Sequence, residues 1–277
     1  MASGRNSIVI SIFSTSSGNG KTVTAINLAA GLAKEGYAVC LVDLDLQFGD
    51  IVKYLKLEPK YTIADAQRGF MLNQEHFDLR TYLTEYRHEE LSFYVLAPPD
   101  MVYDAYRIEV GVVEEFIERL NWFDFIILDL NAMFSALNLA MLDLSTIINY
   151  VGIIDFLPSV KNFKIGYDTL IRFEYEESKI RLVENRSNSQ KLIKGNDVER
   201  LVGEKFFHKL PNDFKSVNQS VRSGMPLMYA APDSALTKSF GALARSYTNR
   251  QDTPPPPDPV EEQNHNIFSR VLSAIFG

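Results

Sequence analysis

The fold of this chain is decided near its start, where the residues read Ile8-Val9-Ile10-Ser11-Ile12-Phe13-Ser14-Thr15-Ser16-Ser17-Gly18-Asn19-Gly20-Lys21-Thr22. The β-branched run up to Phe13 is typical of a buried strand, and a polar, glycine-containing loop follows it. Lys21 to Glu35 has the apolar spacing of a helix and precedes Gly36, a common helix stop. Ala38 to Val42 is a second apolar run. A strand, a helix and a strand in this order predict a βαβ unit with parallel strands.

The same alternation continues along the chain. It predicts strands at Leu91–Leu96, Phe123–Asp129, Ile147–Ile154 and Lys179–Val183, and helices at Val112–Leu120 and Lys161–Phe173. This pattern predicts one α/β domain with a mostly parallel central sheet flanked by helices. We expect the domain to span residues 1–248. Four consecutive prolines within residues 249–263 predict an extended linker, and residues 264–277 form a separate terminal segment.

The composition excludes several classes of protein. The 277 residues are 46% apolar, which is ordinary for a globular core and rules out disorder over the whole chain. A single cysteine, Cys40, excludes an intramolecular disulfide and favours a reducing cytoplasm. No run of about 18 apolar residues predicts a membrane-spanning helix, and the start does not resemble a signal peptide. The net charge of −7 is the sum of −10 over residues 1–160, +4 over residues 161–222 and −1 over residues 223–277.

The loop between the first strand and the first helix is typical of a phosphate-binding site. Backbone N–H groups and a helix N-terminus at this place can hold phosphates. Lys21 would contact the β- and γ-phosphates, and the Thr22 hydroxyl would complete the coordination of Mg²⁺. The common pattern G-x-x-x-x-G-K-[ST] fails at its first glycine, where this chain has Thr15. The alternative interpretation is a tight turn that starts a helix.

The loop, its helix and the run Asp43-Leu44-Asp45-Leu46-Gln47-Phe48-Gly49-Asp50 together resemble the ParA/MinD superfamily of P-loop ATPases with a deviant Walker A motif. The acidic run is most similar to the CpaE/TadZ branch, which acts in pilus assembly. The resemblance continues through Leu96–Pro99, Phe123–Asp129, Pro158–Asn162, Glu184–Arg186 and Leu210–Ala244. It implies a single P-loop NTPase domain that binds ATP and Mg²⁺ and forms a homodimer with the nucleotides sandwiched between the two copies.

The resemblance also implies roles for individual residues. Lys21, Asp45 and Asp43 would be catalytic, with Asp45 orienting the attacking water and Asp43 assisting at the γ-phosphate and the metal. Thr22 and Asp129 would hold Mg²⁺, Asp129 through water. The expected nucleotide-binding residues are Ser17, Gly18, Asn19, Gly20, Lys21, Thr22 and Val23 in the loop and helix, and Asn185, Arg186, Pro211, Asn212 and Asp213 around the adenine. The alternatives are solvated acids at strand ends and ordinary turn residues.

The chain departs from its family at the signature lysine, which reaches the partner's phosphate across the dimer. Ser16 occupies that position, and Ser17 replaces the glycine that follows it. Without this cation we expect slow hydrolysis. We also expect strain at Ser17 of roughly 1 kcal/mol, because the position favours glycine. Lys161, together with Lys164, could substitute for the missing cation in trans. The alternative is that both are solvated lysines near a helix start.

The segment 264–277 predicts an amphipathic helix after the linker. Its large apolar residues form one stripe and could lie in a membrane interface: Ile267, Phe268, Val271, Leu272, Ile275 and Phe276. Arg270 is the only firm positive charge in this segment, so attraction to anionic lipid is weak. The alternative is a helix that docks on its own domain or on a partner.

These features favour a positioning or assembly ATPase of the CpaE/TadZ type. Such a protein would localise pilus or secretion machinery, and we expect it in the cytoplasm and at the inner face of the cytoplasmic membrane, with a cell pole as one candidate location. The alternative is a ParA/McdA-like partitioning ATPase that binds non-specific DNA and positions a cargo, which the positive charge of residues 161–222 favours. A third interpretation is a scaffold that no longer hydrolyses nucleotide.

Overall fold

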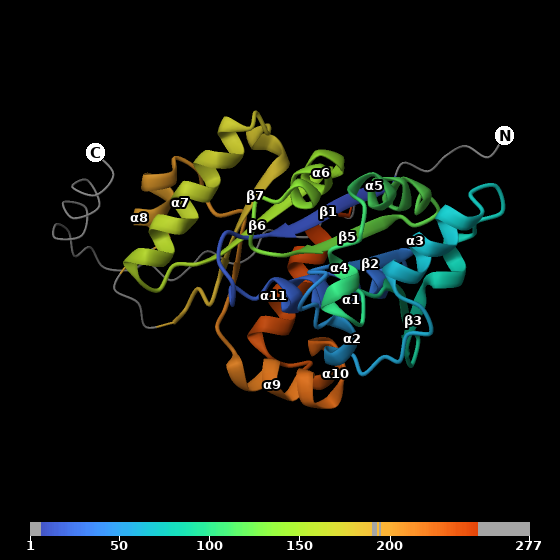
Figure 1. Cartoon of the computed structure of the whole chain (residues 1–277). Coiled ribbons are helices and arrows are strands. Elements are labelled where there is room, and N and C mark those ends of the chain that lie inside the picture. The colour runs from blue at the N-terminus through green and yellow to red at the C-terminus, as the bar shows by residue number, and fades with distance from the viewer. Residues whose placement is uncertain (1–6, 190–192, 194, 249–277) are drawn as a thin grey trace.

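A computed structural model describes residues 7–189, 193 and 195–248 of the chain. Within these residues eight strands form one sheet in the order β3-β4-β2-β5-β1-β6-β7-β8, with helices on both faces (Figure 1). Every neighbouring pair is parallel except β3 and β4. This confirms the predicted α/β architecture. The predicted linker 249–263 and terminal helix 264–277, with Ile267 to Phe276, lie outside the described residues.

The strand positions follow the apolar runs of the sequence. The strands are β1 (Ile8–Phe13), β2 (Val39–Leu44), β3 (Thr84–His88), β4 (Leu91–Leu96), β5 (Phe125–Leu130), β6 (Ile147–Ile153), β7 (Ile180–Asn185) and β8 (His208–Leu210). Six of these eight were predicted to within two residues at each end. Neither β3 nor β8 was predicted, because β3 is a polar antiparallel edge strand and β8 has three residues.

The helices are α1 (Lys21–Lys34), α2 (Ile51–Tyr54), α3 (Ile63–Leu72), α4 (Val102–Ala105), α5 (Val110–Arg119), α6 (Ala136–Leu144), α7 (Leu157–Arg172), α8 (Gly195–Val202), α9 (Phe214–Ser223), α10 (Leu227–Ala230) and α11 (Ala235–Ser246), with 3₁₀ turns η1 (Leu79–Tyr82) and η2 (Glu177–Lys179). The helices up to α8 lie between strands along the chain, and α9, α10 and α11 follow β8. None of the helices in the described part of the chain is long and apolar enough to span a membrane.

Alternating side chains of the strands form a core on each face of the sheet. In β1, Val9 and Phe13 point to the core that α3, α5, α6, α7 and α8 cover. Ile10 and Ile12 point to the core that α1, α10 and α11 cover. Because the sheet is buried on both faces, its central strands are almost continuously apolar. Helix α1 lies against β2, β4 and β5 on one side and α11 on the other, which fixes its N-terminus at the end of β1.

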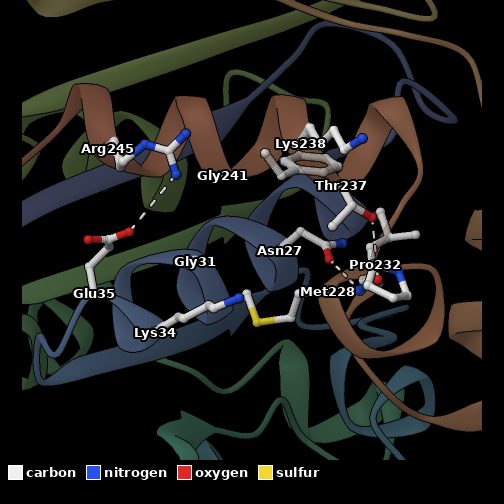
Figure 2. A pocket seen from close by; sticks show the side chains of 12 residues that line it. Asn27, Gly31, Lys34, Glu35, Met228, Pro232, Thr237, Lys238, Gly241 and Arg245 are labelled. Atoms are coloured by element: carbon white, nitrogen blue, oxygen red, sulfur yellow. Dashed lines mark hydrogen bonds and ion pairs between the residues drawn. The ribbon is translucent and has the colours of Figure 1, made fainter. Parts of the chain in front are cut away.

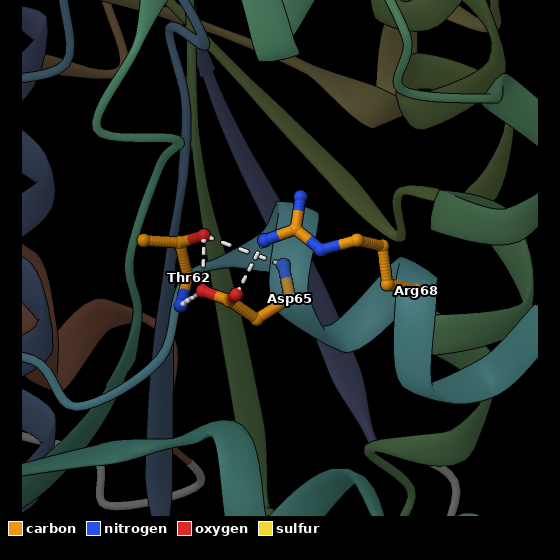
Figure 3. Close-up of polar contacts among 3 residues, drawn as sticks. All are labelled: Thr62, Asp65 and Arg68. Atoms are coloured by element: carbon orange, nitrogen blue, oxygen red, sulfur yellow. Dashed lines mark hydrogen bonds and ion pairs between the residues drawn. The ribbon is translucent and has the colours of Figure 1, made fainter. Parts of the chain in front are cut away.

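A capping box formed by Thr62 and Asp65 starts α3 (Figure 3). The Thr62 hydroxyl accepts from the Asp65 N–H at 3.4 Å, and the Asp65 carboxylate accepts from the Thr62 N–H at 2.8 Å. Burial alone would raise the pKa of Asp65, but the hydrogen bonds from Thr62 and the charge of Arg68 lower it below the ordinary value. The box therefore holds the start of α3 in place.

Candidate nucleotide site

The candidate site lies where the central parallel strands end. The loop Ser14–Gly20 connects the carboxyl end of β1 to α1, and β1 lies between β5 and β6. At the same edge of the sheet, Asp43 near the end of β2 is in register with Asp129 near the end of β5. Ligands of open α/β sheets bind outside the carboxyl ends of the strands. The fold thus brings the predicted loop and the predicted acids together.

The glycines of the loop have the backbone conformation that a phosphate cradle requires. Gly18 and Gly20 have φ values of 76° and 84°, in the left-handed region that side chains disfavour. Gly20 precedes the first residue of α1, so the free N–H groups of the helix start face the loop. Ser17 is not among the residues with positive φ. The expectation of strain at Ser17 is therefore wrong, because the left-handed positions fall on glycines.

Asn185 lies beside the loop. Its side-chain amide donates to the carbonyl oxygen of Asn19 at 2.8 Å, and a Cβ on Gly20 would clash with the same amide. Asn19 donates in turn to the carbonyl of Val151 at 3.4 Å. The end of β7 thus supports the second half of the loop. The contact with adenine expected of Asn185 stays a prediction.

Lys21, Thr22 and Asp129 form the charged centre of the site. Burial lowers the pKa of Lys21, while the charges of Asp129 and Asp45 oppose that effect. Asp129 is 1% exposed, and burial raises its pKa to about 7, although a hydrogen bond from the Thr22 hydroxyl and the charge of Lys21 act in the other direction. The charges of Asp129 and Asp45 therefore act on the Lys21 ammonium.

One oxygen of Asp129 fits the predicted metal site. Its Oδ1 atom is buried and makes no hydrogen bond with any residue that the structure describes. A buried carboxylate oxygen without a partner is costly, and a divalent cation or its bound water satisfies it. Together with the Thr22 hydroxyl, it supplies the hard oxygen ligands that Mg²⁺ prefers. These residues therefore fit Mg²⁺.

Asp43 is fully buried, and its carboxylate accepts two backbone hydrogen bonds. The N–H groups of Asp45 and Ile51 both donate to it at 3.2 Å. Gly49 covers the same carboxylate so closely that a Cβ there would lie 2.5 Å from Oδ2. Burial and the charge of Asp129 raise the pKa of Asp43. Asp43 thus holds the segment between Asp45 and Ile51, and Asp45 itself is half-buried at the start of that segment.

The first half of the loop is attached to α7, which the sequence did not predict. The Thr15 hydroxyl lies 2.8 Å from the Tyr150 hydroxyl and donates to the Asn162 carbonyl at 3.0 Å. The Asn162 amide also donates to the Ser16 hydroxyl at 3.5 Å. Gly166 of α7 leaves the space for this contact, since a Cβ there would overlap Thr15 and Tyr150. The only signal in the sequence was Thr15 at a position where the family has glycine.

The two lysines considered as replacement cations differ in their surroundings. Lys164 binds both oxygens of Asp168 at 2.6 Å within α7. Lys161 is exposed near the start of α7 and forms no ion pair with a described residue. Lys161 is therefore the better placed of the two to reach another molecule, and its role in trans stays a prediction.

The remaining predicted residues lie in the first turn of α1 and after the ends of β7 and β8, where they make local contacts. Val23 is half-buried in the first turn of α1, and its carbonyl accepts from Asn27. Arg186 follows β7 with a φ of 56°. The Asn212 N–H donates to Asn188 at 2.6 Å. Asp213 caps α9 by accepting from the Ser216 N–H at 3.0 Å, and Pro211 follows β8 directly. Contacts of these residues with adenine remain predictions.

Comparison with known proteins supports the assignment of a nucleotide-binding domain. The family of the CobQ/CobB/MinD/ParA nucleotide binding domain matches residues 10–227. The septum site-determining protein MinD of Thermotoga maritima is 25% identical over 246 residues, 86% of each chain. A solved ParA family ATPase of Chlorobium tepidum has a TM-score of 0.77 at 23% identity, covering 86% of this chain and 98% of that one. MinD of Pyrococcus horikoshii, solved with Mg-ADP, has a TM-score of 0.75 at 20% identity, covering 88% and 96%. The chain belongs to the CobQ/CobB/MinD/ParA family of nucleotide-binding domains.

Proposed function

We propose that the protein is an ATPase that binds Mg²⁺-ATP at the loop Ser14–Gly20 and forms a homodimer when ATP is bound. The observation that carries this proposal is the group of Lys21, Thr22 and Asp129 beside a loop with two left-handed glycines. Ser17, Gly18, Asn19 and Gly20 would surround the phosphates, while Thr22 and Asp129 would hold the metal. Mg²⁺, when bound, neutralises charge on the phosphates.

The residues of this chain divide the chemistry among them. Lys21, which is partly desolvated, binds the terminal phosphates more strongly than a solvated lysine would. Asp45 orients the attacking water. Asp43 holds the backbone of Asp45 in place, because its carboxylate accepts a hydrogen bond from the Asp45 N–H group. Ser16 supplies no cation across the dimer, so the proposed hydrolysis is slow.

Exposed apolar residues at the same edge of the sheet support dimerisation. Phe48 follows β2, Met133 follows β5 and Phe156 follows β6, and these side chains are 71%, 58% and 58% exposed. Met101, 63% exposed, follows β4. Apolar side chains that gather around a ligand site on a free surface are typical of a protein interface. A second copy that covers this edge would also exclude water from the nucleotide.

Titration calorimetry and gel filtration test this function. ATP with Mg²⁺ should bind the wild-type protein and shift it to a dimer, whereas Lys21→Ala should abolish both effects. Asp45→Ala should bind ATP, dimerise and show no turnover. Lys205→Ala, at an exposed lysine after α8, is the matched control and should behave as wild type. Binding of ATP by Lys21→Ala with unchanged affinity would contradict the proposed site.

We further propose that the dimer localises pilus or secretion machinery, as in the CpaE/TadZ branch, and that the segment Ile267–Phe276 holds it at the membrane. Dimerisation doubles the apolar segment and so strengthens a weak membrane contact. Co-sedimentation with liposomes, with and without residues 264–277, tests this proposal. Equal binding of both forms would reject the membrane segment.

The second candidate function is DNA binding, which the net charge of +4 over residues 161–222 favours. A dimer would place two copies of this region on one surface. In a gel-shift assay with random DNA, this function predicts an ATP-dependent shift that weakens steeply between low and moderate salt. Absence of a shift at low salt would exclude the second function.

A further inference from the structure

A hollow of about 250 Å³ lies between α1, α10 and α11, away from the nucleotide site (Figure 2). Its walls include Leu227, Met228, Pro232 and Phe240. Gly241 of α11 leaves the wall open, since the nearest atom to a Cβ there is a nitrogen of Arg245 at 3.4 Å. Leu227 and Phe240 are almost fully buried, and the polar residues Asn27 and Thr237 also line the hollow. Met228 and Pro232 therefore form its accessible apolar surface.

The rim of the hollow is positively charged. Lys34, Lys238 and Arg245 line it together with one acid, Glu35 (Figure 2). Arg245 pairs with Glu35 at 4.0 Å. Lys34 and Lys238 are exposed and form no ion pair with any residue in the described part of the chain. Two lysines that form no ion pair within the described part of the chain thus lie on α1 and α11, beside Met228 and Pro232.

The chain continues from α11 with a segment of matching chemistry. Residues 249–263 contain one arginine and four acids, a net charge of −3, and five prolines. Asp252 and Asp258 stand on either side of Pro254–Pro257. An extended chain advances about 3.1 Å per residue, so Pro254 can lie up to about 19 Å from Thr248. Along α11, Lys238 lies only about 10 Å from Arg245.

We propose that the proline-rich segment 249–263 docks into the hollow between α1 and α11 of its own chain. The prolines pack on Met228 and Pro232, and the carboxylates of Asp252 and Asp258 pair with Lys34 and Lys238. Proline segments suit shallow apolar grooves because their backbone loses little conformational entropy on binding. The segment would then rest on α1, the helix that begins at the phosphate loop.

Zero-length carbodiimide cross-linking of the full chain, mapped by mass spectrometry, tests the proposal. Amide bonds should join acids of residues 252–262 to Lys34 or Lys238. A mixture of ¹⁵N-labelled and unlabelled protein should show that they form within one chain. Lys34→Glu with Lys238→Glu should reduce these cross-links at least fivefold, whereas Lys205→Glu, on the other face of the sheet, should not.

A charge exchange and a filled hollow make the test specific. Adding Asp252→Lys and Asp258→Lys to the double lysine variant should restore cross-linking with the charges reversed. Gly241→Met fills the hollow without a change of charge and should also reduce the yield. Cross-links to Lys205 and Lys215 as frequent as those to Lys34 and Lys238, or cross-links only between labelled and unlabelled chains, would overturn the proposal.

Discussion

Asp129 connects the stability of the protein with its ligand. The carboxylate is buried, and one of its oxygens has no partner among the described residues. Its pKa is raised to about 7, so near neutral pH the unliganded protein carries a partly protonated acid where Mg²⁺ is expected. Binding of the cation favours the ionised form. Nucleotide binding should therefore release a proton from Asp129.

Because the pKa of Asp129 is about 7 in the folded protein and has the ordinary value of 3.8 in the unfolded chain, Asp129 affects stability as pH changes. The folded protein keeps the proton on Asp129 to a higher pH than the unfolded chain does. Below about pH 4 Asp129 therefore does not lower the free energy of unfolding, and between about pH 4 and pH 7 it lowers that free energy increasingly. We predict that Asp129→Asn gains stability relative to wild type over this range, by up to a few kcal/mol.

Urea unfolding at several pH values without nucleotide measures this difference. Asp233→Asn, at an exposed acid before α11, is the control and should show no pH-dependent difference from wild type. A constant difference between Asp129→Asn and wild type from pH 4.5 to 8 would contradict the assigned titration.

Ser16 is the residue at which the chain departs most from its family. Its hydroxyl accepts a hydrogen bond from the Asn162 amide of α7 at 3.5 Å. We predict that Ser16→Lys raises the turnover of ATP by about tenfold or more, since a cation then reaches the phosphates across the dimer. Ser17→Lys, one position further, is the control. An unchanged rate in Ser16→Lys, measured at saturating ATP, would show that the missing lysine does not limit hydrolysis.

At the scale of elements, the phosphate loop connects two helices on opposite faces of the sheet. The loop leads directly into α1, and the Thr15 hydroxyl attaches it to α7. The contact depends on Tyr150 of β6, whose hydroxyl lies near both Thr15 and the Phe163 carbonyl, at 2.8 and 3.0 Å. A movement of α7 therefore changes the position of the loop.

We predict that Tyr150→Phe folds normally with a loss of about 1 kcal/mol, the value of a buried hydrogen bond. The loop, which then keeps only its hydrogen bonds with Asn162 of α7, should bind ATP several times more weakly. Tyr247→Phe, which removes a hydrogen bond to the buried Asn149 on the opposite face of the sheet from Tyr150, is the control and should lose stability without losing affinity. Equal ATP affinity of Tyr150→Phe and wild type would show that the attachment to α7 does not position the loop.

Local sequence patterns predicted most of the elements but not their contacts. Strands β1, β2 and β5 are apolar runs buried on both faces, so a short window of sequence identifies them. The polar alternation of β3 has no such pattern. The contact between Thr15 and Tyr150 joins residues 135 positions apart, and no local pattern encodes it. Similarly, the cover of Gly49 over Asp43 depends on the path of the loop after β2.

At the scale of the whole molecule, the candidate nucleotide site lies at the carboxyl ends of the central strands, where we propose that a second copy binds. Lys161 is exposed near those strand ends, whereas Lys164 is paired with Asp168. We predict that Lys161→Ala weakens ATP-dependent dimerisation and that Lys164→Ala does not. Analytical ultracentrifugation with ATP and with ADP measures this difference. Equal dimerisation of both variants and wild type would remove Lys161 as the replacement cation.

The central claim is that Lys21, Thr22 and Asp129 bind Mg²⁺-ATP, and the most direct test is calorimetric titration with ATP, with and without Mg²⁺. Wild type should bind ATP more tightly with Mg²⁺, and its measured binding enthalpy should vary with the ionisation enthalpy of the buffer, because a proton is released. Asp129→Asn should bind ATP equally with and without Mg²⁺, and Lys21→Ala should not bind it. Tighter binding with Mg²⁺ in Asp129→Asn, of the same size as in wild type, would contradict the account.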